Sequence, residues 1–519
     1  MKKSIIITAI LSLALYGLIF LVSPDRTTLL AAAAGIVASL IFIAIAIIEI
    51  RSPASHRMPW IYFLPLSIIF LAIPVFFAVV LFNSGAFSVL LLIVMVSLAF
   101  SFFYNFLNIP LALYHKYQEN KQSKKPLTYF PSMSIIVPAY NEEKCIAGTL
   151  ETLLEAYYPD KEIIVVDDGS TDRTYEIALT YSDRGVKVIQ RPNGGKAAAL
   201  NHGLQFASGE IMVCVDADSM VGRTSLAEMM RKFEDPDVIA VAGNIKVLNR
   251  DKFLSACQAL EYIFDINIAR RGLDTFGAVI VVPGCLGAFR TEALRNSAGW
   301  DTETVVEDFD TTIKIFKGGA FDQHSHTGSQ DPDIQATTKG LKSGKVVQAS
   351  SAAVGYTEAP ENIQDLWKQR QRWYRGNFQT LFKHRDAFVN SRYGALYGLS
   401  FPYIVISMMF IPLSMVAVFV TAIVAIMDGF ILQLLMIFGV FTILQLIISI
   451  LAIELDDEDL RLAWYAPFFV IGYKHLLDFI KMKAFFDVIT RQKMGWDKLE
   501  RIGLYPKETT QRDPVTAPQ

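Results

Sequence analysis

Two carboxylates spaced two residues apart, Asp216 and Asp218, follow the apolar segment Ile211–Val215. On an extended backbone, residues i and i+2 point to the same side, so both carboxylates could hold one hard cation. Mg²⁺ is typically held by one or two carboxylates together with substrate phosphates, and it neutralises a departing diphosphate. A solvated turn after a strand would contain the same residues, so the pair alone leaves both interpretations open.

Two other acidic groups lie in comparable surroundings. Asp167 and Asp168 follow an apolar, strand-like segment and precede a glycine. Ligands of open α/β sheets bind beyond the carboxyl ends of the strands, so this pair suits hydrogen bonds to a nucleoside, although Asp-Asp-Gly is also a good turn. The segment Val305–Asp310 places three carboxylates before a helix-like stretch, Thr311–Phe316. One of them could take a proton from an attacking hydroxyl, or they could cap the helix, and spacing does not separate these roles.

A basic and aromatic segment, Trp367–Phe382, contains Gln369, Arg372 and Trp373. Its arginines and tryptophans could anchor a helix among lipid headgroups. They could also cover a sugar site, because a tryptophan ring stacks on a pyranose face and an arginine clamps diphosphate oxygens. The residue types alone leave both interpretations open.

These groups are spread over a polar middle region, residues 132–390, in which strand-like and helix-like segments alternate. Such alternation is typical of an open α/β sheet with helical crossovers. The expected strands are Ser134–Tyr140, Glu162–Asp168, Val186–Gln190, Ile211–Asp218 and Val238–Gly243. The expected crossover helices include Glu142–Ala156 and Lys196–Ala207.

The composition indicates that this region is joined to membrane segments. Of 519 residues, 52% are hydrophobic and 19% are charged, which is too apolar for a purely soluble protein. The formal net charge of -2 gives no sign of the basic face that nucleic-acid binding needs, so we set nucleic acid aside. The four cysteines are scattered without CxxC spacing, which indicates a reducing compartment with neither a disulfide framework nor a zinc site.

Long apolar runs on both sides of the middle region predict membrane helices, since a span needs roughly 20 apolar residues. Residues 1–115 hold four such runs, at 5–22, 29–48, 60–82 and 86–109, and residues 400–455 hold a hairpin of two, at 401–427 and 431–453. No small-residue cleavage site follows the first run, so we expect an uncleaved anchor. Lysines and arginines cluster on the side of the N-terminus and of the middle region. This bias predicts an integral plasma-membrane protein with residues 132–390 in the cytoplasm.

The C-terminal part is less regular. Residues 463–490 begin as an apolar run but carry six ionisable side chains between Lys474 and Asp487, which are costly at the centre of a bilayer. We therefore favour a re-entrant or interfacial amphipathic helix over a seventh transmembrane helix. Residues 491–519 form a basic segment followed by a tail that we expect to be disordered.

Taken in order, the motifs resemble glycosyltransferase family 2, in its membrane-integrated processive branch of cellulose, hyaluronan and poly-N-acetylglucosamine synthases. The motifs that carry this resemblance are Ser134–Glu142, Val166–Ser170, Gly194–Ala198, Asp216–Asp218, Val282–Cys285, Glu307–Asp308 and the QxxRW pattern at Gln369, Arg372 and Trp373. The resemblance implies an α/β GT-A (Rossmann-like) cytoplasmic glycosyltransferase domain inserted between transmembrane helices.

The resemblance also implies a role for each motif residue. Asp308 matches the family's catalytic base, and Asp216 and Asp218 match the ligands of Mg²⁺ or Mn²⁺. The residues implied at the nucleotide are Pro138, Tyr140, Glu142, Asp168, Lys196 and Asp216. The residues implied at the acceptor and the diphosphate are Gly284, Cys285, Gln369, Arg372 and Trp373.

Two features depart from the family pattern. The threonine that precedes the Glu-Asp pair in the family is Val306 here, so a hydroxyl beside the base is lost. Residues 318–344 form an insertion whose role the sequence does not assign. We interpret its His324 and His326 as solvated loop residues rather than metal ligands.

These observations predict an inverting, processive glycosyltransferase that polymerises a UDP-sugar, N-acetylglucosamine-like or glucose, into a β-linked polysaccharide and exports it through its own spans. Its partners are then the UDP-sugar, a polysaccharide or lipid acceptor, membrane lipid and, where one is needed, a small auxiliary membrane subunit. Two alternatives remain open: a transferase that adds one sugar to a lipid, and a nucleotide-sensing membrane transporter. The scarcity of charge in the apolar runs argues against the transporter. Neither the sugar nor the linkage follows from the shared motifs.

Overall fold

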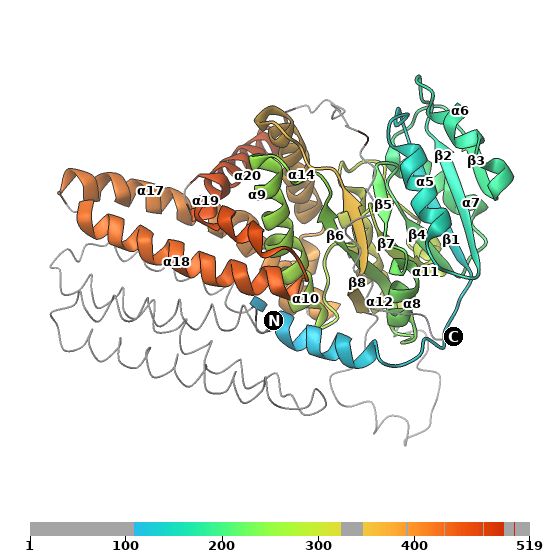
Figure 1. Ribbon diagram of the computed structural model, residues 1–519, viewed down its shortest axis with the longest axis horizontal. Coiled ribbons are helices and arrows are strands. Elements are labelled where there is room, and N and C mark those ends of the chain that lie inside the picture. Colours follow the sequence, from blue (N-terminus) through green and yellow to red (C-terminus); the bar gives the residue numbers. More distant parts are fainter. Residues whose placement is uncertain are drawn as a thin grey trace, which may run out of the picture.

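The computed structural model describes residues 108–322, 346–492 and 503, with short gaps at 110, 391–392, 430 and 471. The predictions for the first four spans, for most of the insertion 318–344 and for nearly all of residues 491–519 lie outside the described residues. Within the described residues, a part built around a β-sheet joins a helical part that extends away from it (Figure 1).

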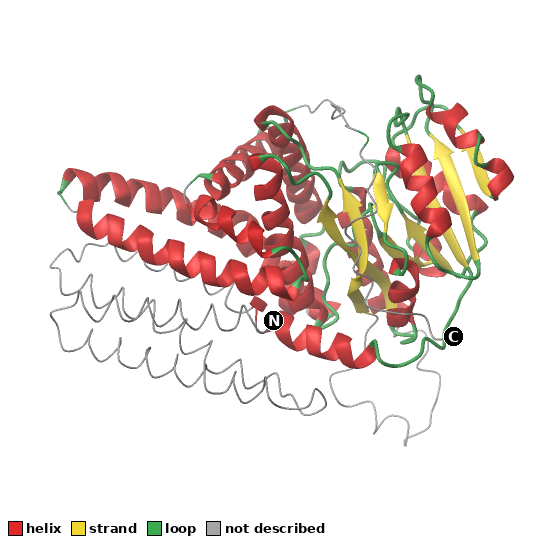
Figure 2. Ribbon diagram, viewed as in Figure 1, coloured by secondary structure: helices red, strands yellow, loops and turns green. Residues whose placement is uncertain are grey.

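An eight-stranded mixed sheet organises the first part, with helices packed on its faces (Figure 2). Its strand order is β3-β2-β1-β4-β7-β6-β8-β5. The pairs β3-β2, β2-β1, β1-β4 and β6-β8 are parallel, whereas β4-β7, β7-β6 and β8-β5 are antiparallel. The strands are β1 (Met133–Ala139), β2 (Lys161–Asp167), β3 (Val186–Gln190), β4 (Ile211–Cys214), β5 (Ser219–Val221), β6 (Val238–Val247), β7 (Gly287–Arg290) and β8 (Val346–Thr357).

The helices fall into two groups. Those interleaved with the strands are α5 (Ile146–Glu155), α6 (Thr174–Leu179), the short 3-10 helix η2 (Ser182–Arg184), α7 (Lys196–Phe206), α8 (Ser225–Phe233), α11 (Thr291–Asn296) and α12 (Glu307–Asp322). Those of the helical part are α9 (Phe253–Glu261), the π-helical η3 (Tyr262–Ile268), α10 (Ala269–Asp274), α14 (Ile363–Lys383), α15 (Asp386–Val389), η5 (Leu396–Ser400), α16 (Phe401–Val405), η6 (Ile406–Phe410), α17 (Ile411–Met427), α18 (Ile431–Leu455), η7 (Leu460–Tyr465), α19 (Ala466–Val470) and α20 (Tyr473–Ile489).

Strand β1 shows why the sheet forms at this place in the sequence. All of its residues are buried, and alternate side chains enter different cores: Ile135 and Val137 pack on one face of the sheet, and Ile136 packs on the other. Helix α7 lies so close to the second face that a Cβ at Gly203 would stand 2.6 Å from Ile136 Cγ2. Pro138 is tolerated because β1 pairs with β4 only as far as Ile136, so no ladder bond on that side needs its missing N–H.

The predicted strands β1, β2, β3 and β6 agree with the structure to within a few residues. The prediction of an extended segment over Ile211–Asp218 is wrong in its second half. Strand β4 ends at Cys214, and a hydrogen bond from the Ser219 N–H to the Asp216 carbonyl (3.0 Å) closes a turn before β5. The alternation of side chains in a strand therefore does not explain how Asp216 and Asp218 are oriented.

After α14 the chain enters a long apolar helix. Leu396–Val424 is 29 residues long with a mean hydropathy of 2.4, and it is the single segment of the described residues long and apolar enough to cross a membrane. It combines η5, α16, η6 and α17. Helices α17 and α18 lie side by side and extend away from the sheet, with α9, α14 and α20 nearer to it (Figure 1). Two adjacent helices therefore occupy the residues of the predicted transmembrane hairpin.

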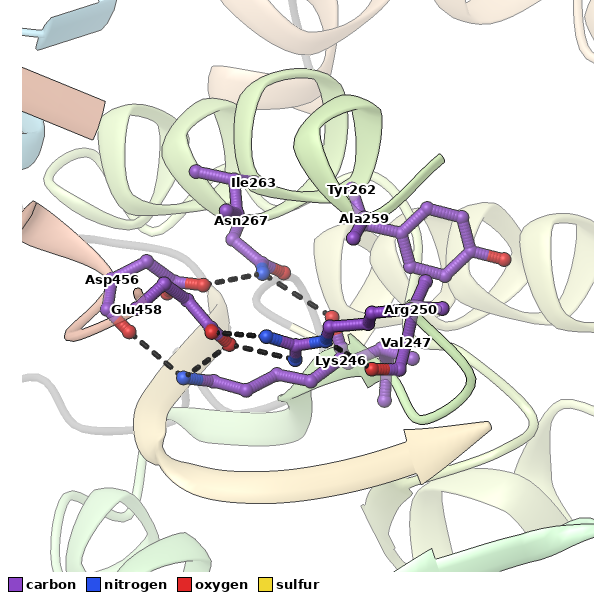
Figure 3. Close-up of a pocket in the computed structure, with 10 residues that line it drawn as sticks. Lys246, Val247, Arg250, Ala259, Tyr262, Ile263, Asn267, Asp456 and Glu458 are labelled. Carbon is purple, nitrogen blue, oxygen red and sulfur yellow. Dashed lines mark hydrogen bonds and ion pairs between the residues drawn. The ribbon is translucent and has the colours of Figure 1, made fainter. Parts of the chain in front are cut away.

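The end of α18 is fastened to the sheet by five side chains that we call the Asp456 clasp: Lys246, Arg250, Asn267, Asp456 and Glu458 (Figure 3). The fully buried carboxylate of Asp456 accepts a hydrogen bond from Asn267 Nδ2 (3.0 Å), and its carbonyl accepts one from Lys246 Nζ (2.8 Å). Glu458 forms ion pairs with Arg250 and with Lys246 Nζ (3.0 Å). The clasp joins the loop after α18 to β6 and η3.

Residues 463–490 form parts of η7, α19 and α20, with a break before Tyr473. Helix α20 packs against α14. It buries charged side chains and exposes aromatic ones, the reverse of a helix on the surface of a soluble protein. Its charged residues Asp478, Lys481 and Asp487 are buried, whereas Phe479 and Phe486 are 60% and 57% exposed. Four of the charges that make this segment a poor membrane span form ion pairs within the helix, Asp478 with Lys481 and Lys483 with Asp487.

Candidate active site

The Asp-Asp-Gly motif lies at the carboxyl end of β2, where it organises two loops. The Asp167 carboxylate accepts a hydrogen bond from the Ser170 N–H (3.3 Å), so the motif does form a turn. The neighbouring Asp168 carboxylate accepts hydrogen bonds from the N–H groups of Gly194 (3.1 Å) and Gly195 (2.7 Å), which lie just before α7. Burial raises the pKa of Asp168, and the two N–H donors offset part of this rise. The motif therefore forms a turn, and the same turn holds the predicted site residue Asp168 at the carboxyl end of β2.

The loop after β1 supplies the other residues predicted at the nucleotide. Pro138 is the second-to-last residue of β1. Tyr140 is the first residue after the strand, and 37% of its surface is exposed. The Glu142 N–H donates to Thr174 Oγ1 (2.7 Å), which holds the loop against the start of α6. Because β1 and β2 are parallel neighbours, these residues and Asp168 lie at the same edge of the sheet.

Lys196, the first residue of α7, is the centre of a charged cluster. Its Nζ lies 2.6 Å from Asp216 Oδ1 and 3.0 Å from Glu307 Oε1. Burial lowers the pKa of Lys196, but the carboxylates of Asp216 and Glu307 outweigh it and raise the pKa well above its usual value. The Lys196 and Asp216 side chains keep 25% and 29% of their surface exposed, so a ligand can reach them.

The loop of Gly284 lies directly against this cluster. A Cβ at Gly284 would stand 2.6 Å from Lys196 Nζ and 3.5 Å from Asp216 Oδ1. The absence of a side chain therefore keeps the space beside the lysine open. Burial raises the pKa of the adjacent Cys285 thiol to about 12, so it is neutral and unsuited to act as a nucleophile.

Asp308 lies in the first turn of α12, which begins at Glu307 and not after Asp310 as predicted. Its Oδ1 accepts a hydrogen bond from the Phe309 N–H (2.8 Å), so it also caps the helix. Burial and the neighbouring charge of Glu307 raise the pKa of Asp308 to about 6. A carboxylate with a pKa close to neutrality is suited to general-base catalysis.

Thr312, one turn along α12, connects Asp308 to the loop before Gly284. Its Oγ1 donates to the carbonyl of Asp308 (2.7 Å) and accepts from the Val282 N–H (3.0 Å). The hydroxyl of Thr312 therefore fixes the position of the candidate base relative to this loop.

Helix α14 carries the remaining predicted residues, Gln369, Arg372 and Trp373. The Trp373 ring packs against Tyr262 of η3, with ring centroids 6.4 Å apart, and against the guanidinium of Arg370. Gln369 is buried, and Arg372 is partly exposed. Trp373 therefore contacts the body of the protein and stays partly exposed.

Sequence reasoning missed three of the charged groups in this region: Glu307 as the partner of Lys196, Arg370 inside α14, and Arg270 of α10. Arg270 donates from Nη1 to the Gly243 carbonyl (3.0 Å), and burial lowers its pKa to about 10. Glu307 and Arg370 lie inside recognised motifs, but no local pattern indicates their partners, because those partners are distant in the sequence.

Asp216 and Asp218 fit a divalent cation that is completed by a ligand. Within the described residues, no group of three or more histidine, cysteine, aspartate or glutamate side chains converges to hold a metal by itself. The charge of Asp218 contributes to raising the pKa of Asp216, after burial, so the two carboxylates are close in space. Mg²⁺ typically takes one or two carboxylates and completes its shell with phosphate oxygens and water, and this donor set matches that requirement.

Comparison with known proteins identifies the sheet-based part. Residues 134–297 match the model of "Glycosyl transferase family 2". They form a family 2 glycosyltransferase domain. The family 2 domain contains Asp168, Lys196, Asp216 and Asp218, and it ends before Asp308 and α14.

The relatives include poly-beta-1,6-N-acetyl-D-glucosamine synthases. The Staphylococcus epidermidis protein is 30% identical over 275 residues, which are 52% of this chain and 61% of that protein. The Staphylococcus aureus (strain COL) protein is 28% identical over 293 residues, which are 56% of this chain and 65% of that protein. The chain thus spans less than two thirds of the length of these relatives.

The fold of the family 2 domain is GT-A. A mannosyltransferase from Pyrobaculum calidifontis, solved in complex with GDP-Man and Mn2+, shares this fold at 21% identity with a TM-score of 0.50. The match covers 77% of this chain and 100% of that chain. This confirms the predicted GT-A fold of the middle region.

Proposed function

We propose that this protein is an inverting glycosyltransferase that takes a UDP-sugar and transfers the sugar to a hydroxyl of a growing polysaccharide. The observation that carries the proposal is the Asp308 carboxyl, with a pKa of about 6, beside the charged cluster of Lys196, Asp216 and Glu307. A base and a cationic site for a departing anion are the two groups that this reaction needs.

In this proposal each group has one role. The Asp308 carboxylate accepts the proton of the acceptor hydroxyl, whose oxygen attacks the anomeric carbon while the bond to the UDP oxygen breaks on the opposite side. Asp216 and Asp218 would hold Mg²⁺ or Mn²⁺, which supplies charge neutralisation to the diphosphate. Lys196 lies beside the same position and would stabilise the released UDP.

The residues around these groups would bind the rest of the substrates. Pro138, Tyr140, Glu142 and Asp168 would bind the nucleoside at the carboxyl ends of β1 and β2. The residues that would contact the acceptor end and the diphosphate are Gly284, Cys285, Gln369, Arg372 and Trp373.

We further propose that the product is a β-linked polymer, N-acetylglucosamine-like or glucose-based, and that it leaves through the protein's own spans. The relatives named poly-beta-1,6-N-acetyl-D-glucosamine synthase support the polymer. The apolar helix Leu396–Val424 supports membrane insertion, and the bias of basic residues supports a cytoplasmic transferase domain.

Helix α20 then lies at the membrane surface. Its exposed aromatic residues, Phe479 and Phe486, are seven residues apart and share one helix face, opposite the charges buried against α14. A face of this kind suits the boundary between headgroups and acyl chains.

The test is a UDP-release screen on the full chain in lipid nanodiscs with Mg²⁺ or Mn²⁺, using UDP-glucose, UDP-N-acetylglucosamine, UDP-glucuronate and UDP-galactose. Release with one donor, and a ladder of radiolabelled products of increasing size, are the expected results. A single labelled glycolipid would replace polymerisation by addition of one sugar to a lipid. No UDP release with any donor would favour a nucleotide-sensing transporter.

A further inference from the structure

Arg370 is one of the largest side chains that are completely buried within the described residues. It occupies the second position of the QxxRW pattern, between residues that the proposed function assigns to the substrate. Burying a guanidinium is costly unless it is paired and hydrogen-bonded. A buried ion pair also rarely stabilises a fold more than apolar side chains of similar volume would. The arginine therefore calls for a role besides stability.

Its polar contacts connect three helices. Arg370 Nη2 lies 2.8 Å from Glu261 Oε2 at the end of α9, and Nη1 donates to Gln369 Oε1 (2.5 Å). The same Glu261 oxygen accepts a hydrogen bond from the hydroxyl of Tyr473, the first residue of α20. The guanidinium is thus held by Glu261 of α9, by α20 through Tyr473 and Glu261, and by Gln369 of its own helix.

The guanidinium also lies over two aromatic rings. Arg370 Cζ lies 4.2 Å from the centroid of the Trp373 ring, one helical turn away, and 5.8 Å from that of Tyr262. Trp373 remains partly exposed, so the ring is covered on one side and is accessible elsewhere. A cation–π contact is stronger when the cation is removed from water, as the guanidinium of Arg370 is.

We propose that Arg370 is a positioning residue for Trp373 and Gln369, and that Glu261 and Tyr473 hold it in place. The inference rests on the proposed function, in which those two residues contact the acceptor end and the diphosphate. It also gives α20 a part in the transferase, because Tyr473 completes the support of Arg370.

The experiment is a double-mutant cycle on the full chain in nanodiscs, combining Arg370→Lys with Trp373→Ala. Lysine keeps the positive charge for Glu261 but loses the planar stack and the second donor. We expect Arg370→Lys to lower kcat on the order of 10-fold in the parent and less than about 2-fold when Trp373 is already alanine, because an interaction that acts through one residue disappears with it. The affinity for UDP, measured in the same four proteins, should show the same coupling, because Trp373 and Gln369 are assigned to the acceptor end and the diphosphate. An equal loss of kcat in both backgrounds would overturn the proposal.

A second readout needs no sugar transfer. The change in tryptophan fluorescence caused by Arg370→Lys should vanish in a Trp373→Phe background, because only the stacked ring reports the substitution. A change of equal size in both backgrounds would contradict the stacking. A parent protein that releases no UDP from any donor would refute the proposed function, while the fluorescence cycle would still decide whether Arg370 positions Trp373.

Arg375→Lys is the matched control. Arg375 is also buried in α14, its Nη1 lies 3.8 Å from Asp487 Oδ2 of α20, and its Nη2 donates to the Gln492 carbonyl. It has the same chemistry and the same neighbouring helix without the stack on Trp373. Arg375→Lys should leave kcat within about 2-fold and show no coupling to Trp373→Ala. Equal coupling of both arginines to Trp373 would show a general loosening of α14 and would overturn the assignment to Arg370.

Discussion

Replacing Asp308 by asparagine should abolish most of the rate and at the same time stabilise the fold. The pKa of Asp308 is raised from 3.8 to about 6 by burial and by Glu307. The rise from 3.8 to about 6 corresponds to about 3 kcal/mol by which the folded state disfavours the ionised form. Asparagine carries no charge, and its oxygen can still accept the hydrogen bond from the Phe309 N–H.

The pH dependence gives the sign. A raised pKa means that the folded state binds a proton that the unfolded state has released, so stability is highest below pH 4 and falls as the pH rises toward 6. Above pH 6 the folded state bears nearly the whole free-energy cost of keeping Asp308 ionised. Asp308→Asn should therefore raise the melting temperature at pH 7 and raise it about half as much at pH 5. Thermal unfolding without nucleotide and with EDTA, at steps from pH 5 to pH 8, measures this difference.

Asp310→Asn is the control of opposite sign. Asp310 lies in the same helical turn and is fully buried, with Oδ1 2.8 Å from His384 Nε2 and 2.9 Å from Lys383 Nζ. Burial raises the pKa of Asp310, but these two partners outweigh it and lower the pKa. Removing its charge should destabilise the fold at pH 7 by on the order of 3 kcal/mol. If Asp308→Asn destabilises the protein as Asp310→Asn does, the raised pKa is wrong.

Turnover completes the measurement. A general base contributes on the order of 10²-fold or more, so kcat of Asp308→Asn should fall by at least that factor. Its affinity for UDP should stay near that of the parent, because a base acts in the transition state. The parent's kcat/KM should fall as the pH drops below about 6, where Asp308 becomes protonated. A variant with normal turnover would refute the assignment of the base.

Asp218→Asn should weaken UDP binding and reduce its dependence on divalent metal, as measured by calorimetric titration with and without Mg²⁺; unchanged metal dependence would contradict the metal role. Trp373→Ala should lower turnover far more than it lowers the melting temperature, and an unaltered turnover rate would return the residue to the headgroup-anchor interpretation. Gly376→Ala should destabilise the protein by about 1–3 kcal/mol, because the new Cβ would stand 2.6 Å from Val306 Cγ1. Adding Val306→Ala should recover most of this loss, and no recovery would refute the packing argument. A cysteine at Ser84 should react with an impermeant maleimide from outside the cell, and protection of that cysteine would reverse the predicted topology.

The sequence predicted those parts of the fold whose cause is local. An apolar strand followed by Asp-Asp-Gly identified β2 and its turn, because turn chemistry is determined by adjacent residues. Strands β5 and β7, of three and four residues, were not predicted because they are too short to show a period. The turn at Asp216 was predicted as a strand, since the apolar run before it does not show where pairing with β1 ends.

The site residues could likewise be predicted where a local motif marks them, but not where their properties depend on distant residues. Asp308 could be named from a motif, but its raised pKa depends on burial and on Glu307, and burial is set by the whole fold. The pairing of Arg370 with Glu261 joins residues 109 positions apart, so no window of sequence contains both. Buried charges of this kind can be predicted only after the helices have been placed.

The Asp456 clasp has a mechanical consequence. It fastens the loop after α18 to β6, and at the other end of the hairpin the Ser400 hydroxyl donates to the Ala278 carbonyl (2.7 Å), so both ends contact the part built around the sheet. Helices of fixed length respond to a thinner or thicker bilayer by tilting. In the proposed membrane setting, a hairpin attached at both ends cannot tilt freely without displacing β6. We therefore expect turnover to depend on the acyl-chain length of the surrounding lipid.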